Sequence, residues 1–177
     1  SPTEYTTEAV KGSDIIFLTT NGTRIISRFK GAHGVVIASL ANLSRVVTHL
    51  GSQGLNVAIC CAGSRDQFCL EDSVCAGLLV DRLLKQYGDA ELNDAARVGL
   101  VLARSYSDNL LACFRESSHG RTLIELGFES DLELCARLDT LDVLPVYFKE
   151  RITLEQEIEP PLEEPGSKNP GQSAATS

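Results

Sequence analysis

The chain contains no methionine and no tryptophan, and only 6% of its 177 residues are aromatic. Because translation begins with methionine, the opening Ser1-Pro2-Thr3 is interpreted as the start of a processed, trimmed or partial polypeptide. No apolar run approaches the roughly 20 residues of a membrane-spanning helix, and no secretory signal is visible, so no membrane partner is expected. The hydrophobic fraction of 43% is too high for a disordered chain and predicts one domain with a substantial core.

The chain also lacks basic character, with a formal charge of −8. Residues 154–177 hold five of the 24 acidic residues and one of the 16 basic residues, so the body over residues 1–153 carries −4. A mildly acidic body gives no electrostatic footprint for nucleic acid. We expect residues 1–153 to form the domain and residues 154–177 to form an acidic, disordered tail.

The six cysteines lack the spacing of a disulfide framework or a zinc site. Cys60 and Cys61 are adjacent within an apolar run, and others lie in helix-like apolar stripes, which is typical of small buried side chains. Free thiols indicate a reducing compartment, so a cytoplasmic location is expected.

Short apolar runs alternate with segments of helical periodicity in the first half of the chain. The expected strands cover residues 14–20, 34–39 and 55–62, and the expected helices cover residues 23–30, 42–50 and 71–87. The strands are continuously apolar, which indicates burial on both faces. The pattern therefore predicts an α/β fold, a three-layer α/β/α arrangement with a mostly parallel sheet.

The second half is expected to be mostly helical, with one final strand. The helices are expected over residues 91–104, 107–117, 120–126 and 130–138, and the strand over residues 141–148. Asn42 suits the start of one helix, Gly88 the end of another, and Ser130 with Glu133 resembles a capping box.

Three loops follow the three expected strands, and each leads into a helix N-terminus. In an open α/β sheet such loops meet at the carboxyl edge, where exposed N–H groups bind anions. One loop alone is more simply a tight turn or a cap, but three together favour a small anionic ligand. The candidate binding residues of these loops are Thr20, Asn21, Gly22, Thr23, Asn42, Ala62 and Gly63.

Glu71 and Asp72 open the longest expected helix directly after the third loop. The helix dipole alone favours acids there. Alternatively, one carboxylate binds Mg²⁺ or activates water while the other supports it, since Mg²⁺ prefers carboxylate and phosphate oxygens. Arg24, Arg65 and Arg121 are candidate anion clamps or ordinary surface residues. His119 is a candidate general acid or an exposed residue.

Several phosphate chemistries lack their motifs. The chain has no Gly-x-x-x-x-Gly-Lys-Ser/Thr loop. It has no Asp-x-Asp after the first expected strand and no Arg-His-Gly. The spacing from Cys60 or Cys61 to Arg65 does not fit a Cys-x5-Arg loop.

Several segments resemble the 2-phosphosulfolactate phosphatase family, called ComB. They are Thr19-Thr20-Asn21-Gly22-Thr23-Arg24, Leu70-Glu71-Asp72-Ser73-Val74-Cys75-Ala76-Gly77, Ser118-His119-Gly120-Arg121 and Asp142-Val143-Leu144-Pro145-Val146. The resemblance covers about residues 1–150. It implies a magnesium-dependent phosphatase that cleaves 2-phosphosulfolactate to sulfolactate and phosphate, a step toward coenzyme M.

The same resemblance implies a further N-terminal portion that has no counterpart here. Two alternatives therefore stay open: a phosphatase of another small phosphorylated hydroxy acid, and a fragment that binds the anion without catalysis. A homo-oligomer is also left open.

Overall fold

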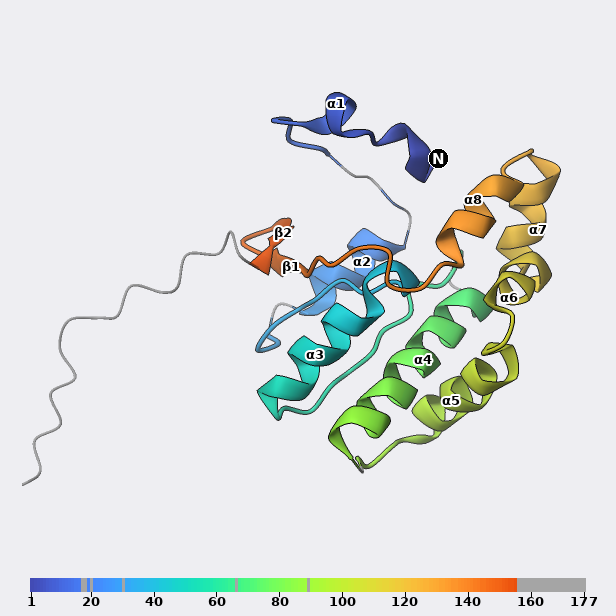
Figure 1. Ribbon diagram of the computed structural model, residues 1–177. Coiled ribbons are helices and arrows are strands. Elements are labelled where there is room, and N and C mark those ends of the chain that lie inside the picture. The colour runs from blue at the N-terminus through green and yellow to red at the C-terminus, as the bar shows by residue number, and fades with distance from the viewer. Residues whose placement is uncertain (17–18, 20, 30, 66, 89, 156–177) are drawn as a thin grey trace, which may run out of the picture.

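The computed structural model describes residues 1–16, 19, 21–29, 31–65, 67–88 and 90–155. The helices are α1 (Thr7–Val10), α2 (Gly22–Ile26), α3 (Leu43–Gln53), α4 (Leu70–Tyr87), α5 (Asp94–Tyr106), α6 (Leu110–Glu116), α7 (Ser118–Glu125) and α8 (Glu129–Cys135). The strands are β1 (Pro145–Phe148) and β2 (Arg151–Leu154), and short 3-10 turns lie at Pro2–Glu4, Ser27–Phe29 and Leu40–Asn42. Helices α3, α4 and α5 lie side by side, and α6, α7 and α8 stack at one end (Figure 1).

The longest helix, α4, confirms the prediction over residues 71–87. It ends at Gly88, whose φ of +85° favours glycine and whose N–H donates to the carbonyl oxygen of Leu84. Its apolar stripe packs against neighbours on both sides, because α3 lies along one flank and α5 along the other. This helix therefore anchors the rest of the fold.

Two apolar clusters form the core. The first joins α3, α4 and β1 and contains Leu43, Val46, Val47, Leu79, Leu144 and Val146. The second joins α4 to α6 and contains Leu40, Val74, Leu110 and Cys113. Burying a side chain of this size contributes about 1.5–3 kcal/mol, so these contacts hold α4 in place at both ends.

The sheet observed in the described residues is a small antiparallel hairpin. β1 pairs with β2 from Pro145 opposite Leu154 to Phe148 opposite Arg151. On the other edge of β1, Val36 forms an isolated antiparallel bridge with Val146. Of the expected strands, 141–148 is confirmed over its second half, and 34–39 is reduced to this bridge.

The expected three-layer arrangement with a parallel sheet is not formed by the described residues. Residues 55–62 are not assigned to a strand, and neither are the described residues of 14–20, of which 17, 18 and 20 lie outside the described part. Apolar β-branched runs favour extended backbone, but a parallel strand also needs paired neighbours and covered faces. Those faces are open here, since Ile16 is 95% exposed and Leu55 50%. The fold is thus mixed α and β, with helices dominating.

The helices of the second half appear in the expected order. The capping box predicted at Ser130 and Glu133 is wrong, because α8 begins at Glu129 and has no side-chain cap. The helix expected over residues 23–30 is divided into α2 and a 3-10 turn. Leu154, expected in the tail, closes β2, whereas residues 156–177 lie outside the described part.

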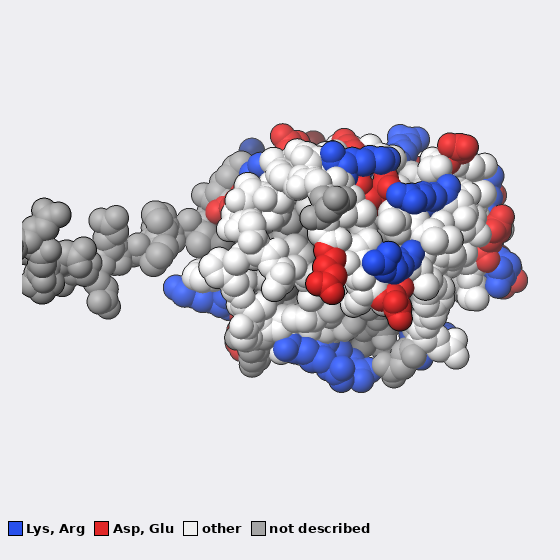
Figure 2. Space-filling model, turned by 90° about the horizontal axis from the view of Figure 1, so that it is seen from below, with Lys and Arg blue, Asp and Glu red and all other residues white. Residues whose placement is uncertain are grey.

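Charges of both signs are interspersed over a mostly uncharged face in the view of Figure 2. All six cysteines are free, and Cys113 is fully buried while Cys60, Cys61 and Cys135 are exposed, against the expectation of burial. Across the described residues, no helix is both long and apolar enough to span a membrane.

Candidate functional site

The first turn of α4 holds two adjacent carboxylates in different surroundings. Asp72 accepts a hydrogen bond through Oδ2 from the N–H of Gly63, at 2.7 Å. The Oε2 atom of Glu71 is buried and has no hydrogen-bond partner among the described residues. A buried carboxylate oxygen without a partner is costly, so it marks a place where a ligand atom would stabilise the fold.

Free thiols surround these carboxylates and are held neutral. The pKa of Cys69 is raised to about 12, first by burial and then by the negative charges of Glu71 and Asp72. Burial and Glu71 likewise raise the pKa of Cys113 to about 12. The residue Cys61 is exposed, but partial desolvation of its thiol and the charge of Asp72 raise its pKa as well. A neutral thiol is a poor nucleophile, so the arrangement does not support cysteine catalysis.

The structure brings the first and third predicted loops together. The Nδ2 group of Asn21 donates to the carbonyl oxygen of Gly63 at 3.1 Å, across 42 residues of sequence. Gly22 and Thr23 begin α2 beside this contact, and Ala62 precedes Gly63 in the exposed segment. Thr20 lies outside the described residues. The predicted meeting of these two loops is therefore observed, although the described residues of the two preceding segments form no strand.

Asn42 from the second loop is buried and fully engaged with protein groups. Its Oδ1 accepts from the N–H of Ser39 at 2.8 Å and from the Ser39 hydroxyl at 3.3 Å. Its Nδ2 donates to the carbonyl oxygens of Ile37 and Val143. Asn42 thus fastens residue 37 to the segment before β1, and its role in substrate binding stays a prediction.

The three candidate arginines are exposed and belong to three different segments of the chain. Arg24 is exposed on α2, and Arg65 is exposed in the turn after Gly63 with a φ of +51°. Arg121 donates to the carbonyl oxygen of Glu116 and to the Ser118 hydroxyl. Arg65 therefore lies nearest in sequence to the Gly63–Asp72 contact, and the clamp function of all three stays a prediction.

The Ser-His-Gly-Arg segment, residues 118–121, forms the first turn of α7, and Ser117 joins it to α6. Ser117 caps α7 by accepting from the N–H of Gly120 at 2.9 Å. A Cβ on Gly120 would overlap the carbonyl oxygen of Phe114, so this position requires glycine. His119 is exposed, and no hydrogen bond or ion pair of the described residues joins it to Glu71 or Asp72.

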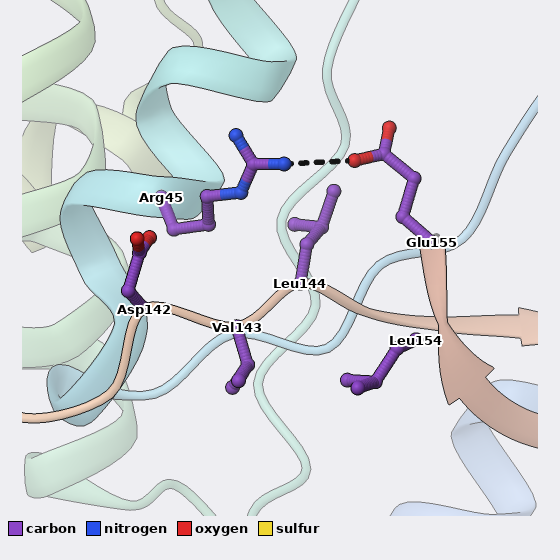
Figure 3. A pocket seen from close by; sticks show the side chains of 6 residues that line it. All are labelled: Arg45, Asp142, Val143, Leu144, Leu154 and Glu155. Atoms are coloured by element: carbon purple, nitrogen blue, oxygen red, sulfur yellow. Dashed lines mark hydrogen bonds and ion pairs between the residues drawn. The ribbon is translucent and has the colours of Figure 1, made fainter. Parts of the chain in front are cut away.

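Two hollows lie away from these residues. The cavity in Figure 3 has a volume of about 40 Å³, and Arg45, Asp142, Val143, Leu144, Leu154 and Glu155 line it. This volume suits roughly one water molecule rather than an organic phosphate. A wider hollow of about 270 Å³ lies between α3 and α4, where Arg82 binds Asp139 and Lys85 binds Asp81.

An ion cluster beside the smaller cavity was missed by sequence reasoning. Glu155 bonds Arg45 at 3.0 Å and His49 at 3.0 Å, and thereby ties the end of β2 to α3. The Arg45–Glu155 bond is visible in Figure 3. Because its partners lie 110 residues apart, no local pattern could have found it.

No group of three or more His, Cys, Asp or Glu side chains suited to a metal occurs among the described residues. Mg²⁺ is usually held by one or two carboxylates together with water and substrate phosphate. Glu71 and Asp72 fit this pattern, because Glu71 has a buried oxygen without a partner and Asp72 has a carboxylate fixed by Gly63.

Two adjacent carboxylates thus open α4 beside two loops that the Asn21–Gly63 hydrogen bond joins. The model of the 2-phosphosulpholactate phosphatase family matches residues 1–150. The chain belongs to this family, which confirms the resemblance predicted from its motifs.

Three relatives illustrate the similarity, each described as a probable 2-phosphosulfolactate phosphatase. The protein of Symbiobacterium thermophilum is 46% identical over 154 residues, which cover 87% of this chain and 66% of the relative. The protein of Caldanaerobacter subterraneus subsp. tengcongensis is 35% identical over 145 residues, 82% of this chain and 60% of the relative. The protein of Synechococcus sp. (strain JA-3-3Ab) is 41% identical over 152 residues, which cover 82% of this chain and 61% of the relative. The chain thus spans less than two thirds of the length of these relatives.

Proposed function

We propose that the chain carries the acidic part of the active site of a phosphatase that hydrolyses 2-phosphosulfolactate to sulfolactate and phosphate. The observation that carries this proposal is the buried Oε2 of Glu71, which has no partner among the described residues. It lies one residue from Asp72, whose carboxylate is already held by a loop amide. Family membership supports the reaction class.

We propose Mg²⁺ as the cofactor, held by Glu71 and assisted by Asp72. When bound, the ion would neutralise phosphate charge and polarise the phosphoryl group. The two carboxylates differ in their hydrogen bonding. Oδ2 of Asp72 accepts a bond from the Gly63 N–H, whereas Oε2 of Glu71 has no partner among the described residues. This difference supports Glu71 as the principal ligand and Asp72 as the carboxylate that supports it.

The remaining residues would position the substrate. Hydrolysis adds water to phosphorus and breaks the bond between phosphorus and the C2 oxygen, and the departing oxygen takes a proton. Loop N–H groups near Gly22 and Ala62 would hold phosphoryl oxygens, while the N–H of Gly63 itself is bonded to Asp72. These loop groups would contribute through positioning and electrostatics. Arg24, Arg65 or Arg121 would hold the carboxylate or sulfonate end. His119 is the candidate proton donor.

The same proposal covers the location of the protein, its ligand and its sheet. A cytoplasmic location, a small phosphorylated acid as ligand and a three-layer sheet formed with additional polypeptide are proposed on the strength of free thiols, family membership and exposed apolar segments. A second candidate is that this chain binds the anion but needs additional polypeptide for turnover, and its basis is that the chain spans 66% and 60% of two relatives.

The test is a phosphate-release assay with and without Mg²⁺, using this chain and the Symbiobacterium relative in parallel. For this chain, Glu71→Gln is expected to lower turnover about 100-fold or more, and Asp72→Asn by a smaller factor. Glu91→Gln, an exposed acid distant in sequence, is the matched control and is expected to change nothing. Wild-type activity in both Glu71→Gln and Asp72→Asn would overturn the metal assignment.

Two further experiments test which substrate is hydrolysed and whether this chain alone is sufficient for turnover. Phosphorylated hydroxy acids without the sulfonate would be hydrolysed more slowly if the sulfonate is recognised. Turnover by the relative but none by this chain, with retained anion binding, would favour the binding-only alternative.

A further inference from the structure

Asn21 occupies the position of a helix N-cap but does not cap its own helix. An asparagine at this position usually accepts a hydrogen bond from an amide in the first turn. The side chain of Asn21 makes no such bond at α2. Thr19 supplies the cap instead, since its hydroxyl oxygen accepts from the N–H of Thr23 at 3.2 Å.

The Asn21 side chain, which makes no capping bond, instead contacts the third loop. Its Nδ2 donates to the carbonyl oxygen of Gly63 at 3.1 Å. The N–H of the same residue donates to Oδ2 of Asp72 at 2.7 Å. Both polar groups of Gly63 are therefore engaged, one by the first loop and the other by the acidic turn of α4.

Position 63 requires glycine. Its φ of +70° favours glycine, and a Cβ there would lie 2.7 Å from the carbonyl oxygen of Gln67. Two backbone hydrogen bonds between Ser64 and Gln67, at 3.2 and 2.9 Å, close the turn that follows. Because the N–H and the carbonyl group of Gly63 flank the same Cα, a hydrogen bond to one of them restricts where the other can lie.

The structure assigns to Asn21 the role of a positioning residue that acts through the Gly63 backbone to fix the Asp72 carboxylate. The assignment rests on the proposed function and deepens it, since Asn21 was predicted to contact substrate directly. Its amide is directed at protein rather than at a ligand. The hydrogen bond from the Gly63 N–H holds Oδ2 of Asp72 toward the loop. The other carboxylate oxygen, Oδ1, is therefore the one available to the site.

The first readout does not depend on catalysis. Amide hydrogen exchange at Gly63 is measured by NMR in the wild-type chain and in Asn21→Ala and Asn21→Asp, neither of which retains the amide donor. We expect exchange at Gly63 to become about tenfold faster in both variants. The Gly120 amide, which bonds to Ser117, is an internal reference and is expected to stay unchanged. Ser27→Ala is the matched control, because it removes a 2.9 Å bond from the neighbouring 3-10 turn without touching Gly63.

The second readout separates positioning from substrate contact. If Asn21 acts through Asp72, both variants lower kcat about tenfold while KM stays within about twofold. A raised KM with unchanged kcat would overturn the assignment, and so would unchanged exchange at Gly63. If the wild-type chain hydrolyses nothing, the proposed function fails for this chain alone, and exchange at Gly63 still decides the positioning role.

Discussion

Gly77 of α4 lies against the backbone of Gly99 of α5, with no side chain between the two helices at this point. A Cβ on Gly77 would overlap the carbonyl oxygen of Gly99 and approach the Ala103 side chain at 2.8 Å. This close approach fixes how far α5 stands from the helix that carries Glu71 and Asp72. The small residues are therefore a requirement of packing, although glycine within a helix costs up to about 1 kcal/mol relative to alanine.

Gly77→Ala is expected to destabilise the fold despite the higher helix propensity of alanine. Backbone atoms cannot move aside as a flexible side chain can, so overpacking should lower the free energy of unfolding by about 1–3 kcal/mol. Urea denaturation measures the effect. Gly34→Ala is the control, because a Cβ there meets nothing within 4 Å, and its change should stay within about 0.5 kcal/mol. Equal stability of the two variants would contradict the packing at this crossing.

Asn42→Ala tests whether the buried amide is structural. The substitution leaves the carbonyl oxygens of Ile37 and Val143 without their donor, so we expect a loss of about 2–4 kcal/mol in unfolding free energy. Asn56→Ala, at an exposed position, should change stability by less than about 0.5 kcal/mol. A stable Asn42→Ala variant that loses anion binding would instead favour the predicted contact with substrate.

The sequence could predict local elements and the meeting of two loops, but not the pairing of strands. α4 was predictable because its apolar period, its first-turn acids and Gly88 all agree. The contact between Asn21 and Gly63 agrees with the expectation that these two loops meet, but the parallel sheet from which that expectation came is not formed by the described residues. A run such as residues 55–62 specifies extended backbone. Its neighbouring strands are set by residues far away in sequence, so the run alone does not predict them.

The functional weight of individual polar residues was harder to predict. Asn42 and Asn21 both begin helical segments within polar loops, so the same role was expected of both. The structure separates them, because Asn42 is buried with four hydrogen bonds and Asn21 makes one bond to Gly63. Hydrogen-bond partners across long sequence separations leave no local pattern, and the same holds for Glu155 with Arg45 and His49.

Gly120 and His119 are adjacent, but substitution by alanine is expected to lower stability only at Gly120. Gly120→Ala places a Cβ against the Phe114 carbonyl oxygen and should destabilise the α6–α7 corner by about 1–3 kcal/mol. His119→Ala removes an exposed ring and should leave the unfolding free energy within about 0.5 kcal/mol.

Phosphate release then tests the chemistry at this corner. A general acid at His119 predicts a loss of about 100-fold or more in His119→Ala. Unchanged turnover in a well-folded His119→Ala variant would remove this residue from the mechanism and leave the segment a structural corner.

The pH dependence of stability should reveal the ion pair between Arg82 and Asp139. Burial alone would raise the pKa of Asp139, but the bond from the Ser44 N–H and the Arg82 guanidinium together hold it below its usual value. These contacts join α4 and the first turn of α3 to the segment before β1. At neutral pH, Asp139→Asn should therefore lower the unfolding free energy by about 1–2 kcal/mol.

The sign follows from the lowered pKa in the folded state. The unfolded chain binds the proton first as pH falls, so the stabilisation from Asp139 is complete above the ordinary aspartate pKa of about 4. It is lost as pH falls further, through the lower pKa of the folded state. The stability difference between wild type and Asp139→Asn, measured by urea denaturation, should be constant from pH 7 to about 5 and shrink below about 4. Asp142→Asn, at a neighbouring exposed carboxylate, should show little difference at any of these pH values. A difference between wild type and Asp139→Asn that grows on acidification would contradict the ion pair, because a protonated Asp139 cannot hold Arg82 more tightly than a charged one.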